Sequence, residues 1–158
     1  MINFNARGFI IPSLNVLSSI QEFETVFVQN INTVQRTHLF ACYNRYLNDL
    51  TKVIGNGHRQ WIDGGYTTQK PNPGDIDLVT FLDSPIVQKH YQDLQAFIYP
   101  HSVVQYGIDA YIVTVYPQNH QHIAQYLSDR AYWFDQFDST KPNRRGHVYP
   151  KGFLEVII

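Results

Sequence analysis

The spacing of apolar residues predicts two helices in the first third of the chain. Ser19 followed by Glu22 fits a capping box, in which the two side chains pair with free N–H groups at a helix start, so we expect a short helix over about 20–28. Apolar side chains then recur at helical spacing as far as the glycine-rich sequence at 55–57. This pattern predicts a second, longer helix that is capped by Asn30 and ended by the glycines.

The rest of the chain mixes strand and helix patterns. The patterns predict, in order, strands over about 60–63 and 75–82, a helix from Ser84-Pro85 to just before Pro100, a β-rich segment over 103–117, a helix over about 119–136 and a closing strand over 153–158. Gly107 lies within the β-rich segment, as a bulge or as the break between two strand pieces. Residues 1–17 are expected to be irregular. This order predicts an α/β (α+β) fold with a small mixed β-sheet covered by helices.

Composition narrows the class of protein without naming a function. The chain has 158 residues, which fits a single domain over 1–158, and 44% of them are hydrophobic while 16% are charged, so a packed core is expected. A formal net charge of −1 gives no global basic field for nucleic acid, so any such contact would have to be local. The single cysteine, Cys42, excludes an internal disulfide. With no signal-peptide pattern and no apolar run of ~20 residues, we expect a cytoplasmic protein without membrane contact.

The candidate chemistry lies in the strand that begins near residue 75. Residues two apart in a strand share a face, so Asp75 and Asp77 are expected to share one, and two carboxylates held so close repel unless a cation or a proton lies between them. Magnesium is usually held by one or two carboxylates together with water and phosphate oxygens. Asp109, on the later apolar strand, is the candidate third carboxylate, and Gly64-Gly65 would let backbone N–H groups approach a phosphate.

Each of these features also has a simpler interpretation. Gly64-Gly65 fits a tight turn, Asp77 fits a surface ion pair, and Asp109 fits a bulge residue. His120 and His122 are two apart at a helix start and do not face each other, so we do not expect a metal site there. The metal hypothesis therefore depends on the combination of features and on their spacing.

That combination resembles a known family. The pattern has three parts. An apolar residue followed by a glycine pair occurs at Ile62-Asp63-Gly64-Gly65, and Asp-apolar-Asp-apolar follows after nine residues, 66–74, at Asp75-Ile76-Asp77-Leu78. A later carboxylate on another strand occurs at Ile108-Asp109-Ala110. The pattern resembles the minimal nucleotidyltransferases of the DNA polymerase beta superfamily. "KPNPGDIDLV" and the closing "PKGFLEV" are similar to an uncharacterised bacterial branch, so the resemblance touches most of the chain.

The resemblance implies a nucleotidyltransferase-like fold and a set of site residues. Asp75, Asp77 and Asp109 would bind Mg²⁺ or Mn²⁺ and act in catalysis, and Gly64-Gly65 would form the turn at the phosphate side. Many active members have serine where this chain has Gly65, and Tyr66 or Thr67 would have to replace its hydroxyl. Lys70 ranks first among the cations for phosphate oxygens, before Lys151 and the Arg144-Arg145 pair. Asp63 places an acidic neighbour beside the proposed phosphate site.

The implied activity is metal-dependent transfer of a nucleoside monophosphate from a triphosphate, such as ATP, to a hydroxyl of a protein, an RNA or a small molecule. Asp109 could also accept the attacking proton. One alternative is a degenerate member that serves as a binding or regulatory module, for example in a toxin–antitoxin or defence pair. Another is a glycosyltransferase that uses its own Asp-x-Asp. The acceptor is unknown, and so small a domain is expected to recognise it with a protein partner or a second subunit.

Overall fold

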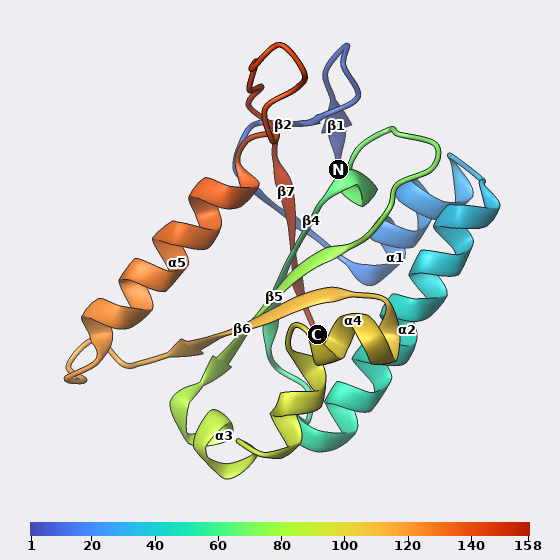
Figure 1. Ribbon diagram of the computed structural model, residues 1–158. Coiled ribbons are helices and arrows are strands. Elements are labelled where there is room, and N and C mark those ends of the chain that lie inside the picture. The colour runs from blue at the N-terminus through green and yellow to red at the C-terminus, as the bar shows by residue number, and fades with distance from the viewer.

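The computed structural model describes residues 1–158 as a mixed α/β domain (Figure 1). The strands are β1 Asn3–Phe4, β2 Ile10–Ile11, β3 Asn15–Ser18, β4 Arg59–Asp63, β5 Asp77–Asp83, β6 Asp109–Val115 and β7 Phe153–Ile157. The α-helices are α1 Ile20–Glu24, α2 Val34–Ile54, α3 Ser84–Lys89, α4 His101–Tyr106 and α5 Ile123–Phe137. A π-helical turn, Thr25–Gln29, extends α1, and 3₁₀ turns occupy Gly65–Thr67 and Asp93–Phe97. None of the helices is both long and apolar enough to span a membrane.

Five strands form one mixed sheet in the order β3-β7-β4-β5-β6. The outer pairs β3/β7 and β5/β6 are parallel, whereas β4 runs antiparallel to both β7 and β5. The short strands β1 and β2 form a separate antiparallel hairpin. The expected small mixed sheet covered by helices is therefore present.

Alternating side chains give the sheet two apolar faces. Ile62, Leu78 and Leu154 belong to the larger core cluster, which also contains buried residues of α1, α2 and α4. Trp61, Val79 and their neighbours belong to a second cluster that packs against α5. In Figure 1, α5 accordingly lies alone on one side of the strands, with α1, α2 and α4 on the other. Successive strand residues face opposite sides, and this assigns each residue near a strand end to one of the two layers.

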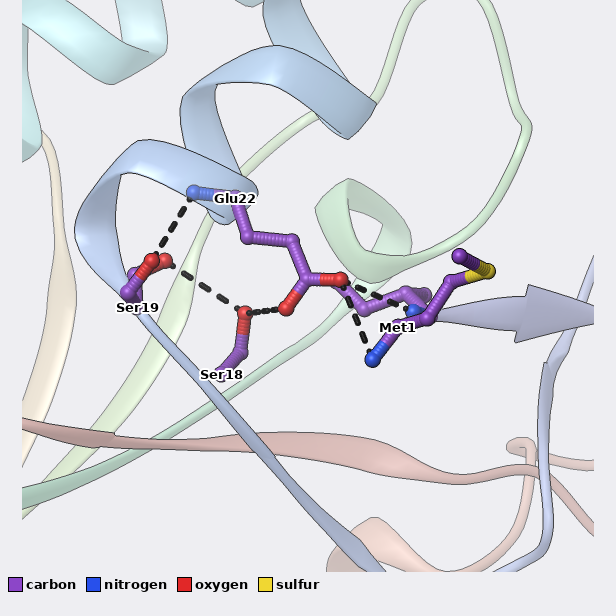
Figure 2. A network of polar contacts seen from close by, with 5 residues as sticks. Met1, Ser18, Ser19 and Glu22 are labelled. Atoms are coloured by element: carbon purple, nitrogen blue, oxygen red, sulfur yellow. Dashed lines mark hydrogen bonds and ion pairs between the residues drawn. The ribbon is translucent and has the colours of Figure 1, made fainter.

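The first helix begins where the capping pattern predicts. Ser19 accepts a hydrogen bond from the backbone N–H of Glu22. The Glu22 side chain turns to the N-terminal segment, where its carboxylate accepts hydrogen bonds from the Ser18 hydroxyl and the Ile2 N–H and pairs with the Met1 amino group (Figure 2). Although burial opposes ionisation, these contacts lower the pKa of Glu22 below its ordinary value. This network attaches the segment that contains β1 to α1.

The long helix α2 ends at Gly55 as expected, with a positive φ of 80°, but it begins later than expected. Thr33, in extended conformation, is the cap, and its hydroxyl accepts the N–H of Arg36 at 3.3 Å. Asn30 instead ends the π-helical turn. Thr33 prevails because it has both the extended backbone and the hydroxyl that a cap requires.

The N-terminal segment is not irregular, although the sequence suggested that it would be. It contains β1, β2 and β3, and β3 pairs in parallel with β7, with Asn15 opposite Phe153. This pairing joins two ends of the chain, so no local pattern indicates it.

The region 84–107 also differs from expectation. The single helix expected from Ser84-Pro85 is divided into α3 and the 3₁₀ turn, and α4 occupies the first part of the expected β-rich segment. Gly107 is neither a bulge nor a strand break, because it caps α4 in left-handed conformation with a φ of 71°. Tyr106 packs its ring on Tyr46 and Phe97, and this tertiary contact outweighs the strand preference of the two valines before it. The last helix, α5, begins at Ile123 rather than near 119.

Candidate functional site

Three aspartates lie side by side at one edge of the sheet. In the strand register, Asp63 at the end of β4 is opposite Asp77 at the start of β5, and Asp77 is opposite Asp109 at the start of β6. We call Asp63, Asp77 and Asp109 the carboxylate row. Asp63 and Asp77 are two residues from Trp61 and Val79 of the second core cluster, and Asp109 is two residues from Tyr111, which packs against that cluster. All three therefore lie on the face of the sheet that α5 covers.

Asp75 lies outside the strand that the sequence assigned to it. The strand begins at Asp77, and Asp75 is exposed in the preceding loop. Both carboxylates nevertheless line the same cavity, and the charge of Asp75 raises the pKa of Asp77. The predicted shared strand face is therefore wrong, and the two residues reach the cavity from a loop and from a strand end.

The electrostatics of the row disfavour a fully ionised state. Burial, followed by the charges of Asp75, Asp63 and Asp109, raises the pKa of Asp77 from 3.8 to about 7, and Lys141 opposes the rise. One oxygen of Asp109, Oδ1, is buried without a hydrogen-bond partner. A buried carboxylate oxygen with no partner is costly unless a proton or a cation approaches it.

The charge of Asp63 is balanced by a lysine of the same chain. Its carboxylate is buried and forms an ion pair with buried Lys151, which also donates a hydrogen bond to it. The hydroxyl of Thr67 donates a second hydrogen bond at 3.1 Å. Burial raises the pKa of Asp63, and Lys151 acts in the opposite direction. Lys151 was a candidate phosphate cation in the sequence, but its charge is already engaged here.

The two glycines have different structural roles. Gly64 has a φ of 88°, and a Cβ added there would lie 2.6 Å from Oδ2 of Asp77, so the carboxylate packs directly on the bare backbone. A Cβ on Gly65 would meet its nearest neighbour, Pro73, at 3.5 Å, an ordinary contact. Only Gly64 is therefore fixed by geometry, whereas the position of Gly65 has room for a Cβ.

One cavity of about 950 Å³ collects most of the candidate residues. It lies between the β1–β2 hairpin, the glycine turn, the carboxylate row and α5. The predicted site residues that line it are Asp75, Asp77, Asp109, Gly64, Gly65 and Lys70. Its volume is at the upper end of the range for small-molecule sites.

Two predicted phosphate contacts do not reach this cavity. Tyr66 is fully buried, with its hydroxyl donating to the carbonyl of Arg36 and its ring against Phe23. Thr67 is also buried, and its hydroxyl is used by Asp63 and by the carbonyl of Gly64. Neither can supply the hydroxyl that Gly65 lacks without a rearrangement of the turn.

Arg36 holds the loop after the glycine turn and was not anticipated. Its guanidinium is fully buried and donates five hydrogen bonds to the carbonyls of Phe27, Tyr66, Thr68 and Lys70. Burial lowers its pKa. The fork geometry of arginine suits this task, because it serves several carbonyls in different directions at once. Nothing in the sequence marks this role, since a charged residue in a helix is usually exposed.

Three exposed cations line the cavity. Arg7, Lys70 and Lys141, which we call the basic rim, line it, and none of them forms an ion pair. Arg7, in the β1–β2 hairpin, lies 4.3 Å from the ring of Tyr149. The loop after Lys141 adds exposed Arg144-Arg145, and Figure 1 shows this loop beside the hairpin. Partly buried carboxylates together with exposed, unpaired cations suit a ligand that has several negative charges and a bound cation.

The side chains do not form a complete metal cage. No group of three or more His, Cys, Asp or Glu side chains is arranged to hold a metal ion, either at the carboxylate row or at His120 and His122. The donor chemistry of Asp75, Asp77 and Asp109 nevertheless fits a hard cation, because all their ligand atoms are carboxylate oxygens, one of them unpartnered.

Comparison with known proteins identifies a family but no activity. A family model matches residues 2–157, almost the whole chain. The protein belongs to DUF6932, a family of unknown function. No curated protein and no solved structure shows significant similarity to the chain. The cavity and its residues are therefore the features of this DUF6932 member from which a function can be inferred.

Proposed function

We propose that the protein is a metal-dependent nucleotidyltransferase of the nucleotidyltransferase-like fold, which transfers a nucleoside monophosphate from a triphosphate to a hydroxyl of a protein, an RNA or a small molecule. The observation that carries the proposal is the carboxylate row beside the Gly64 turn, in a cavity with an unpaired basic rim. This arrangement offers separate places for a cation and for phosphate oxygens.

Asp75, Asp77 and Asp109 would hold the metal. Bound there, Mg²⁺ or Mn²⁺ would neutralise charge on the phosphates and lower the pKa of the attacking hydroxyl. The raised pKa of Asp77 and the unpartnered Asp109 Oδ1 support this assignment, because a divalent cation would relieve both penalties.

The residues of the chain would divide the remaining tasks. Backbone N–H groups of the Gly64-Gly65 turn, Lys70 and the rest of the basic rim would hold the phosphates. The hydroxyl oxygen of the acceptor would form a bond to the α-phosphorus as the bond to the bridging oxygen breaks, and pyrophosphate would leave toward the glycine turn. Asp109 would accept the hydroxyl proton. The pairing of Asp63 with Lys151 removes one negative charge from the phosphate side.

Two observations favour a second candidate, a binding or regulatory module without catalysis. The carboxylates are not gathered into a three-ligand set, and the 65 position lacks a hydroxyl. Such a module would bind a protein partner with little or no dependence on metal and triphosphate.

Calorimetric titration distinguishes the two candidates. Wild-type protein is titrated with each non-hydrolysable nucleoside triphosphate, with MgCl₂ or with EDTA, beside Asp77→Asn and the control Asp135→Asn, which changes an exposed carboxylate of α5 outside the cavity. We expect magnesium-dependent binding of at least one triphosphate, lost in Asp77→Asn and kept in the control. At a hundredfold excess over Kd such a ligand adds about 2.7 kcal/mol of stability, which a thermal melt detects independently. Absence of binding for every triphosphate would refute the proposal and favour the module.

A further inference from the structure

The cavity has an aromatic wall next to the carboxylate row. Tyr111 follows Asp109 by two residues on β6, so both side chains lie on the same face of the strand. Its ring centroid is 4.4 Å from that of Trp133 on α5, and Trp133 in turn contacts Tyr132 at 5.3 Å. We call Tyr111, Tyr132 and Trp133 the aromatic wall. All three line the cavity that contains the carboxylates.

This wall is fixed in place but open to the cavity. Trp133 also packs on buried Phe137 at 5.6 Å, which anchors the helix side of the wall. Tyr132 is 57% exposed and Trp133 is half-buried, whereas the other tryptophan on this side of the sheet, Trp61, is fully buried. Large aromatic surfaces held rigidly and left partly accessible are typical of sites that stack a planar ligand.

A polar side chain accompanies the wall on the same helix face. Gln136 is three residues after Trp133, lines the cavity and is exposed. Its amide makes no hydrogen bond within the chain and can both donate and accept. This is the pair of functions needed to distinguish the hydrogen-bonding edges of planar bases.

The order of groups along the sheet edge indicates which part of a nucleotide would lie against the aromatic wall. The glycine turn follows β4, the carboxylates lie on β5 and β6, and the aromatic wall begins on β6 and continues on α5. Anionic groups belong at the glycine and basic side, and a cation belongs at the carboxylates. The far side is left for an uncharged, planar group.

We propose that the aromatic wall is the nucleobase subsite, in which the base stacks on Trp133 and the Gln136 amide reads its edge. This inference rests on the proposed nucleotidyltransferase function and deepens it, because it says where the triphosphate places its base and which residue selects among bases. None of the cations that line the cavity lies on β6 or α5, the two elements that carry the wall, so the wall suits a neutral ring better than a phosphate chain.

Tryptophan fluorescence tests the subsite directly, because the chain has only two tryptophans and Trp61 is buried. Wild-type protein with MgCl₂ is titrated with ATP, GTP, CTP, UTP and inorganic tripolyphosphate, and fluorescence and thermal melts are recorded together. We expect both kinds of ligand to raise the melting temperature, while only nucleotides quench the emission. Stacking on Trp133 explains that difference, since tripolyphosphate has no base.

Variants separate stacking from a general loss of structure. Trp133→Phe keeps a stacking ring, so nucleotide affinity should be close to wild type while the quenching disappears. Trp133→Leu should weaken nucleotide binding roughly tenfold and leave tripolyphosphate binding unchanged. Gln136→Ala changes an exposed side chain, so it should fold normally and alter the ranking of the four nucleotides.

The outcomes distinguish this inference from the function on which it rests. If nucleotides bind with magnesium but neither quench the emission nor bind more weakly to Trp133→Leu, the base lies elsewhere; the inference is then overturned and the nucleotidyltransferase proposal stands. The inference is also overturned if tripolyphosphate binds as tightly as every nucleotide, since the wall would then contact an acceptor instead. If no triphosphate binds, both proposals fall.

Discussion

Replacement of Asp77 by asparagine should stabilise the metal-free protein at alkaline pH. The folded protein raises the pKa of Asp77 from 3.8 to about 7, so it binds this proton more tightly than the unfolded chain does. Wild type should therefore lose stability as pH rises from about 4 to about 7, and the full penalty should be present above 7. Below 4 the group is protonated in both states and the penalty vanishes.

The size of the effect follows from the same shift. One unit of pKa corresponds to 1.36 kcal/mol, so the change from 3.8 to about 7 means that the fold disfavours the charged form of Asp77 by roughly 4 kcal/mol. Asp77 is partly exposed to the cavity, so solvent screening reduces this value, and we expect a gain of about 1–2 kcal/mol for Asp77→Asn. In a domain of this length that gain corresponds to a rise in Tm of about 2–8 °C.

Thermal melts in EDTA at pH 8 and pH 4 measure the difference. The variant should exceed wild type at pH 8 and match it at pH 4, and the exposed control Asp135→Asn should change little at either pH. Added MgCl₂ should raise the Tm of wild type more than that of Asp77→Asn. A variant less stable than wild type at pH 8 would refute the reasoning, because the carboxylate would then be stabilising in its charged form.

Three further predictions test the surroundings of the site. Gly64→Ala should lower the free energy of unfolding in urea by about 1–2 kcal/mol, because the φ of Gly64 is 88° and the new Cβ would meet Asp77. The matched change Gly65→Ser should alter it by no more than about 0.5 kcal/mol. Equal losses would contradict the different roles of the two glycines. Arg36→Lys should lose about 3 kcal/mol, since lysine cannot donate to all four carbonyls at once, and unchanged stability would show that the loop keeps its conformation without Arg36. Burial lowers the pKa of His58 below 6.5, and both its ring nitrogens lack partners, so the unfolded chain takes up the proton more readily and stability should fall as pH drops below 6.5. His58→Asn should weaken that dependence between pH 7.5 and 5, and identical pH profiles for the two proteins would contradict it.

The sequence by itself determined much of the element order. Helical spacing and the Ser19 cap predicted α1 and α2, alternation predicted β4, and apolar stretches predicted β5 and β7. These features are local, since caps, glycine stops and side-chain periodicity act within a few residues. The sequence also placed Gly64, Asp77 and Asp109 on strands or directly after one, and all three residues line one cavity.

The sequence failed where distant residues decided the outcome. Strand β3 exists because it pairs with β7, and α4 replaces a β-rich pattern because Tyr106 packs on Tyr46 and Phe97. Asp75 lies in a loop because pairing of β5 with its neighbours begins at Asp77.

Tertiary structure alone decided the chemistry of the cavity. It paired Asp63 with Lys151, 88 residues away, and buried Tyr66 and Thr67 where the sequence placed phosphate contacts. It also placed Trp133 in the same cavity as the carboxylate row. A residue type and its spacing predict which element a side chain belongs to, but burial, charge pairing and access depend on which elements pack together, and that is a property of the whole fold.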